Sequence, residues 1–327
     1  MTSVAHAWKI RIVAAVIAVA TSLAAAPAGV AQEGGYGPPR TPWGAPDLTG
    51  AWSNKTTTPL ERPAELADQA FLTEEERAAR NPESGVSTEE RSAFMPTGAY
   101  NDFWLEQGEL NLRTSLVVDP PDGRLPPLTG PERQRQQVLP NSFSPTAQFD
   151  SWLDFNTYDR CITRGMPGAM MPGFYNHNYQ IVQTEDHVAI LVEMIHDARI
   201  IPLDGSAHPA PSLRQWLGDS RGRWDGDTLV IETTNFTDKV TTRGGVMIAG
   251  SGHLRTVERL TRVSDDTIAY EITVTDPTVW SAPWTVAVPM TAMDDPVFEY
   301  ACHEGNYALP NILSGQRATD AAGAASR

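Results

Sequence analysis

The sequence has little cysteine, little basic charge and, beyond its first 26 residues, no long apolar run. Two cysteines among 327 residues are too few for a zinc ribbon, and they do not form a CxxC pair. Lys and Arg number 25 against 40 Asp and Glu, so the net charge is −15. Such a chain repels nucleic acid phosphates and anionic lipid. We therefore expect no nucleic acid partner and, without about 20 apolar residues in a row, no membrane span in the mature protein.

The first residues have the pattern of a cleaved secretory signal. Lys9 and Arg11 precede an uncharged run over residues 12–26, and small residues follow at Gly29 and Ala31. A membrane anchor would need a longer run of about 20 apolar residues. We therefore expect residues 1–31 to be a signal peptide cleaved after Ala31, and the mature protein to be periplasmic or secreted.

Export bears on the two cysteines, Cys161 and Cys302. In an oxidising compartment an isolated pair usually forms a disulfide. Two buried thiols, or a metal corner at Cys302 and His303, are the alternatives. We predict the disulfide.

The mature chain divides by composition. Residues 32–150 are rich in Gly, Pro and polar residues, which predicts an extended arm with a short strand at 114–118. The capping pairs Thr73/Glu76 and Thr129/Glu132 predict two short helices, over 74–80 and 132–139. Residues 319–327 are small and polar, which predicts a disordered tail.

Residues 151–318 read as a β-barrel domain. Short β-prone runs, separated by turn-forming pairs such as Asp225-Gly226, occupy residues 179–184, 187–193, 199–203, 221–224, 228–233, 253–263, 267–275, 284–289 and 297–302. We predict a mainly β fold: an antiparallel meander that closes into a barrel, lipocalin-like in general shape, because closure removes exposed edges. Side chains need not fill its interior completely.

Several motifs resemble those of a large family of exported bacterial proteins whose members usually have no assigned function. They are TPWGAPDLTG at residues 41–50, RCITRG at 160–165, EMIHDAR at 193–199, WLGDSRGRW at 216–224, TTNF at 233–236 and YACHEGNY at 300–307. The resemblance covers nearly all of the mature chain. It implies a signal peptide and a β-rich body, and it brings no activity or catalytic residue with it.

The first candidate cluster is the charged run at residues 193–199. As a strand, it would place Glu193, Asp197 and Arg199 on one face and His196 on the other. Such a face is either a solvated exterior or the lining of a polar cavity. A break near Asp197 would instead leave His196 at a strand end, where it could perform acid–base chemistry.

The second candidate is the run at residues 253–263. Alternation places Glu258 on its mainly apolar face, which we expect to point inward. A buried carboxylate is either a candidate general base or the partner of an arginine on a neighbouring strand. His253 follows Gly250-Ser251-Gly252 and could belong to a loop at the barrel mouth.

The third candidate is the Met-rich loop at residues 166–175, which we expect either to plug the barrel or to form the wall of an apolar pocket. The predicted disulfide would bring the loop and its polar neighbours beside His303. The set gathered in this way is Arg160, Tyr175, Asn176, His177, His303, Glu304 and Tyr307.

These clusters predict an enzyme that acts on a small, partly apolar organic molecule in a barrel cavity by acid–base chemistry, as a lyase, isomerase or hydrolase. The sequence has no phosphate loop, dinucleotide fingerprint or HExxH helix, so we expect no nucleotide cofactor. No ligand spacing is diagnostic of a metal, although a divalent ion stays possible. A non-catalytic binding protein and an envelope interaction protein are the alternatives.

In the enzyme hypothesis, His196 or His303 transfers the proton, and Glu258 or Asp197 orients it. Arg199 or Arg160 would hold an anionic group of the substrate. The remaining substrate-binding candidates are Tyr175, Asn176, His177, His253 and Tyr307.

Overall fold

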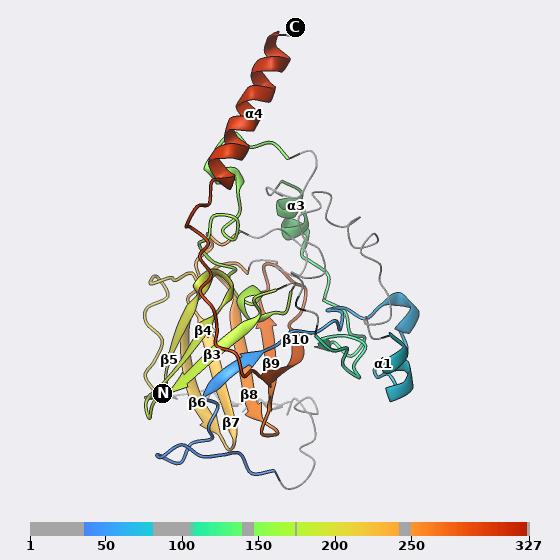
Figure 1. Ribbon diagram of the computed structural model, residues 1–327, viewed down its shortest axis with the longest axis vertical. Helices are drawn as coiled ribbons and strands as arrows, with labels where there is room; N and C mark the ends of the chain where they lie inside the picture. Colours follow the sequence, from blue (N-terminus) through green and yellow to red (C-terminus); the bar gives the residue numbers. More distant parts are fainter. Residues whose placement is uncertain are drawn as a thin grey trace, which may run out of the picture. The chain divides into compact units, whose positions relative to one another are not determined.

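The computed structural model describes residues 36–80, 106, 108–138, 147–173, 175–241 and 250–325. The expected signal peptide lies outside these residues. The predicted fold class is confirmed: the described residues form a mainly antiparallel sheet of ten strands that curls into a nearly closed barrel (Figure 1). None of the described helices combines the length and the apolar character needed to cross a membrane.

Nine strands follow one path, in the order β5-β4-β3-β1-β10-β9-β8-β7-β6, and β2 pairs with β10 beside it. Two consecutive meanders, β3 to β5 and β6 to β10, are therefore joined through β1. The strands are β1 (Gly50–Ser53), β2 (Val117–Asp119), β3 (Asn178–Gln183), β4 (His187–Val192), β5 (Ala198–Pro202), β6 (Asp219–Asp225), β7 (Thr228–Thr234), β8 (Arg255–Arg262), β9 (Thr267–Thr275) and β10 (Trp284–Ala292).

The ring of strands has a seam between β5 and β6. Every neighbouring pair on the path is antiparallel. With nine strands, the two at the ends of the path must then run in the same direction. β5 and β6 lie beside each other, but no backbone ladder between them is found among the described residues. Their connection, residues 203–218, is long because a parallel crossover must return along the strands.

Side chains bridge this seam inside the barrel. Arg199 of β5 donates from Nη1 to Oε1 of Glu258 on β8 at 2.8 Å, and its Nη2 donates to Oε2. Nη2 also donates to the hydroxyls of Ser220 (β6) and Thr233 (β7), each at 3.3 Å, and Tyr270 (β9) donates to Glu258 at 2.9 Å. The network takes one residue from each of five strands. The Arg199 and Glu258 side chains are 1% and 0% exposed.

A glycine on β6 lets the two strands approach. A Cβ atom at Gly222 would lie 2.6 Å from Leu203 Cδ2 and 2.9 Å from Ile201 Cγ2. Since Cβ atoms do not approach other carbons that closely, any larger residue would push the end of β5 away from β6.

The barrel interior is densely filled. Its largest side chains are at most 2% exposed and include Trp52, Tyr179 and Tyr270. Met170 and Met171, from the Met-rich loop, belong to the same core. Of the two predicted roles of this loop, the structure therefore shows the plug.

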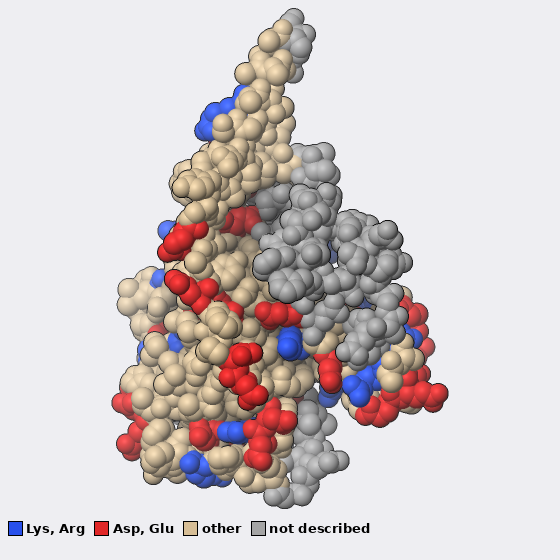
Figure 2. Space-filling view, in the orientation of Figure 1, with Lys and Arg blue, Asp and Glu red and all other residues tan. Residues whose placement is uncertain are grey.

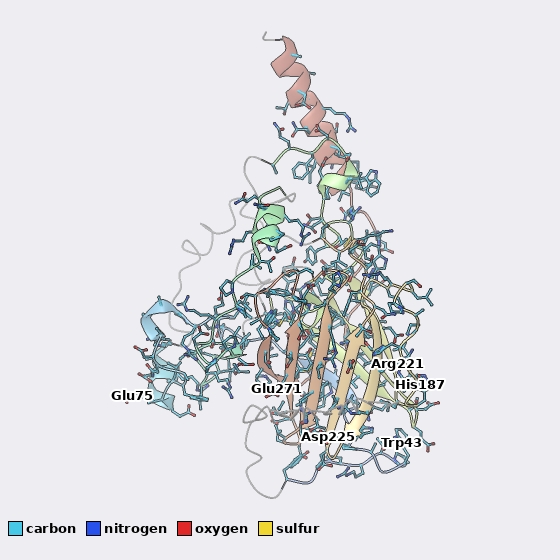
Figure 3. All side chains as sticks on the ribbon, turned by 180° about the vertical axis from the view of Figure 1, so that it is seen from behind. Trp43, Glu75, His187, Arg221, Asp225 and Glu271 are labelled. Carbon is cyan, nitrogen blue, oxygen red and sulfur yellow. A yellow bond between two sulfur atoms is a disulfide. The ribbon has the colours of Figure 1, made fainter. Side chains whose placement is uncertain are left out.

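The outward side of the second meander is charged. Arg221 and Glu271 alternate with inward-facing neighbours on β6 and β9, and Asp225 lies at the end of β6 (Figure 3). This pattern is the usual one for an antiparallel sheet with one solvated face.

The N-terminal arm differs from expectation because it supplies strands to the barrel. β1 lies between β3 and β10, and its Trp52 is 2% exposed. Four residues beginning with Gly50 are too few to show a β-period in the sequence, so the strand escaped the prediction. The expected strand at 114–118 is replaced by the shorter β2, which begins at Val117.

The helices agree with the capping signals, and the tail does not. α1 (Glu74–Arg80) and α3 (Gly130–Val138) occur where they were predicted. The prediction of a disordered tail at 319–327 is wrong for residues 319–325, because they belong to helix α4 (Ala308–Ala325). Its end is rich in Ala, the residue with the highest helix propensity, although the residues are small.

Replacing Glu258 by Gln removes the charge that balances the buried Arg199. Breaking a buried ion pair in this way costs about 3–5 kcal/mol. The matched control is Glu232→Gln, because Glu232 forms a similar two-bond pair with Arg255 that is 36% and 50% exposed. An exposed pair contributes at most about 1 kcal/mol. Urea unfolding of both variants measures the difference, and equal losses of stability would contradict the role given to the seam.

Candidate functional site

The predicted disulfide joins Cys161 to Cys302 and is confirmed, with the two Cα atoms 5.8 Å apart. It ties the loop before β3 to the segment after β10. That segment, residues 297–302, is not the strand that was predicted. β4 already pairs with β3 and β5 on both of its edges, so the segment crosses in front of β3 and β4 without pairing (Figure 1).

A groove of about 340 Å³ lies between this segment and the end of β4. Leu191 is on the outward side of β4, since Ile190 and Val192 point into the core. The groove is therefore on the outside of the barrel. Its lining residues are Leu191, Val192, Glu193, His196, Val297, Phe298, Glu299, Tyr300, Ala301, Cys302, His303 and Glu304.

Two imidazoles face each other in the groove. The ring centroids of His196 and His303 are 6.2 Å apart, and their planes are inclined by 39°. Both side chains are exposed to solvent. A small polar group that enters between the rings can contact both of them.

The turn between β4 and β5 presents His196. Met194–His196 form a tight turn that is not a regular helix, because Ile195 has φ 65° and His196 has φ 57°. A β-branched residue in the left-handed region is strained. Ile195 is fully buried, and its burial offsets that strain. Of the two interpretations of residues 193–199, a continuous strand or a break near Asp197, the structure has the break, and His196 lies between the ends of two strands.

The same turn brings Glu193 to the floor of the groove. Its two carboxylate oxygens accept hydrogen bonds from the side-chain amides of Asn176 and Asn178, at 2.6 and 2.7 Å. Glu193 is 3% exposed. Two directed donors fix the orientation of a carboxylate that has almost no contact with water.

Asp197 lies behind His196. Burial raises the pKa of its carboxyl to about 6, although a hydrogen bond from Thr163 at 2.9 Å and the nearby charges of His196 and Arg164 act in the opposite direction. The carboxyl therefore changes its charge in the range in which imidazoles also do so.

Arg199 and Glu258, two of the predicted site residues, are remote from the groove. They form the ion pair across the seam, the alternative to a general base, and both are out of contact with solvent. An anionic substrate cannot reach the Arg199 guanidinium in this position.

The other predicted residues are scattered over the molecule. Arg160 packs over the Trp152 ring at 5.2 Å. His177 is buried against Arg164, and burial followed by that positive charge lowers its pKa well below the ordinary value. Tyr175 is half-buried against the core, while His253 and Tyr307 are exposed outside the groove lining. Of the predicted set, the groove gathers only His196, His303 and Glu304, with Asn176 beneath Glu193.

The sequence also contains Gly218-Asp219-Ser220-Arg221-Gly222, which has the spacing of the hydrolase nucleophile elbow. That motif needs a strand-to-helix turn with an exposed serine. Ser220 is instead inside β6, 6% exposed, and its hydroxyl bonds to Thr233 and Arg199. Residues 218–222 therefore share the spacing of the motif, but all except Gly218 belong to a strand, and Ser220 is not a nucleophile.

Sequence reasoning missed Phe298, Glu299 and Tyr300 as lining residues, because a strand was expected there. Glu193 was assigned to the opposite face from His196. Neither strand alternation nor helical spacing predicts that Glu193 and His196 lie together, because the turn between them has positive φ at Ile195 and His196.

Within the described ranges, no group of three or more His, Cys, Asp or Glu side chains is arranged to hold a metal ion. No protein-family model, curated protein or solved structure matches the chain. The resemblance drawn from the motifs therefore stays a prediction.

Reduction of the disulfide should destabilise the protein strongly, because the bond spans 141 residues. Chain entropy alone gives about 5 kcal/mol for a loop of this size. Urea unfolding with and without reductant measures the effect, and the Cys161→Ser/Cys302→Ser double variant should match the reduced protein in both conditions. Two reactive thiols in denatured, unreduced protein would contradict the bond.

The Asp197→Asn variant should gain stability relative to the natural protein as the pH rises. Because the folded-state pKa is raised to about 6, the folded state binds the proton more tightly, and the natural protein loses stability between about pH 4 and pH 6. Asn does not titrate, so the difference should grow through that window to at most about 3 kcal/mol and then level off.

The control is Asp186→Asn. Hydrogen bonds from His187 and Thr184 lower the pKa of Asp186, so this replacement should not stabilise the protein at high pH. Thermal or urea unfolding from pH 4 to pH 8 tests both. A pH-independent difference for Asp197→Asn would contradict the burial of its charge.

Proposed function

We propose that the protein is an exported enzyme that acts on a small, partly apolar organic molecule by acid–base chemistry in the groove between β4 and the C-terminal segment. The observation that carries the proposal is the pair of imidazoles 6.2 Å apart across the groove. His is the side chain whose unperturbed pKa suits proton transfer near neutral pH.

In this proposal the substrate's reacting group lies between the rings. His196 removes a proton as general base, and Asp197 behind it stabilises the imidazolium that forms. His303 donates a proton to the group that accumulates negative charge. The Glu193 carboxylate, held by Asn176 and Asn178, adds negative charge at the floor of the groove, and the apolar lining, including Phe298 and Tyr300, contacts the carbon skeleton of the substrate.

The proposed site is on the outside of the barrel, whereas the sequence led us to expect a cavity inside it. The barrel interior holds tightly packed side chains, whereas the groove is outside and has ionisable and apolar groups together. Convergence of ionisable groups favours an enzyme over a carrier. A non-catalytic binding protein is the second candidate, favoured by the solvent exposure of both imidazoles, since catalysis by charged groups benefits from the exclusion of water.

The test incubates the mature chain with a chemically diverse mixture of small organic molecules and follows their consumption by mass spectrometry. His196→Gln and His303→Gln should each slow the conversion by about 100-fold or more, since positioned acids and bases contribute 10²–10⁴-fold. The control is His253→Gln, which removes an exposed imidazole outside the groove.

Full activity in both groove variants would reject the proposed chemistry. Retention of a co-purified molecule by the natural protein without any conversion, and its loss from the groove variants, would support the binding protein instead.

A further inference from the structure

The outward side of the first meander carries an apolar patch and no acidic or basic residue other than His187, unlike that of the second. Register places Val182 of β3, Ala189 of β4 and Ile200 of β5 in one row across the three strands. Val182 is 48% and Ile200 60% exposed. Two strand spacings make this row about 10 Å wide.

A second row connects this surface to the groove. Leu191 of β4 pairs with Ala198 of β5 and, on its other edge, with the polar Gln180 of β3, and Leu191 also lines the groove. We call Val182, Ala189, Leu191, Ala198 and Ile200 the apolar track. It continues into the groove wall formed by Val297, Phe298 and Tyr300, where Phe298 is 65% exposed.

A contiguous apolar surface that leads into a pocket indicates a binding surface more strongly than scattered exposed residues do. The alternating pattern of an outward strand face predicts polar residues at these positions. A ligand that covers Val182, Leu191 and Ile200 would remove their apolar side chains from water and account for apolar residues at these positions.

The groove end of the track is acidic. Glu193, Glu299 and Glu304 line it, and none of the described lining residues is Lys or Arg. Acidic side chains also predominate over basic ones on this side of the molecule below α4 (Figure 2). A negatively charged head group would be repelled here, and a positively charged one attracted.

We propose that the groove and the apolar track bind a cationic amphiphile, with its charged head among the glutamates and its alkyl chain along the track. This inference rests on the proposed function in that it names the substrate class for the same groove. The binding itself requires neither imidazole.

The test uses dodecyltrimethylammonium below its micelle-forming concentration, titrated into the mature chain by calorimetry. One molecule should bind per chain. Dodecanoate, with the same chain length and the opposite charge, should bind at least 10-fold more weakly, and tetramethylammonium, which has no chain, should not bind measurably.

Ile200→Thr and Val182→Thr shorten the apolar surface while they keep the β-branched shape that suits a strand. Each should weaken dodecyltrimethylammonium binding by about 3- to 10-fold through lost apolar area. The control is Leu213→Ser, which removes an apolar side chain of equal exposure, 61%, outside the track and should leave binding unchanged.

Equal binding of dodecanoate, or equal effects of Ile200→Thr and Leu213→Ser, would overturn the proposal, as would the uptake of many molecules per chain. His196→Gln and His303→Gln separate the two proposals. If the two histidine variants lose the conversion of a substrate, but dodecyltrimethylammonium does not bind to the unsubstituted protein, only this inference fails. If dodecyltrimethylammonium binds as expected and the two histidine variants still convert the substrate, only the proposed chemistry fails.

Discussion

The bond between Arg199 and Glu258 is the interaction on which the barrel depends. The strand path leaves β5 and β6 parallel at its two ends, and no backbone ladder joins them among the described residues. The charged pair connects the two ends of the path instead, reaching from β5 past β6 and β7 to β8. The hydroxyls of Ser220 and Thr233 accept from Arg199 Nη2, and that of Tyr270 donates to Glu258. Desolvation makes such a pair costly, so its value lies in fixing one arrangement of the strands rather than in adding much net stability.

The same pair determines where the candidate chemistry is. With Arg199 held in the seam, the start of β5 is fixed, and the turn that carries His196 lies immediately before it. On the opposite wall the disulfide to Cys161 fixes Cys302, the residue before His303. His196 is thus three residues from Arg199, and His303 is adjacent to the disulfide-bonded Cys302, so each imidazole is close in sequence to a fixed residue.

Much of the second meander was predictable from the sequence, because its strands alternate regularly and end at turn-forming residues. The inward position of Glu258 followed from that alternation, and its arginine partner was one of two stated possibilities. The groove was only half predictable. The disulfide pointed to His303, but the positive-φ turn at Met194–His196 and the unpaired path of residues 297–302 depend on tertiary packing. The strand β1 was hidden for the same reason: its neighbours, not its composition, make it a strand.

The position of β1 has a consequence for how the protein is assembled. Trp52 pairs with Tyr179 on one side and with Ala292 on the other, so this short strand joins two meanders that are each continuous in sequence. A chain made from its N-terminus has β1 first, its partner β3 in mid-chain and its partner β10 as the last strand, and contacts at such sequence separation form slowly. Each meander can pair locally as it emerges, whereas the ring is completed only when nearly the whole chain is present. Until β10 is made, β1 can pair with β3 alone, and the second meander remains a separate sheet.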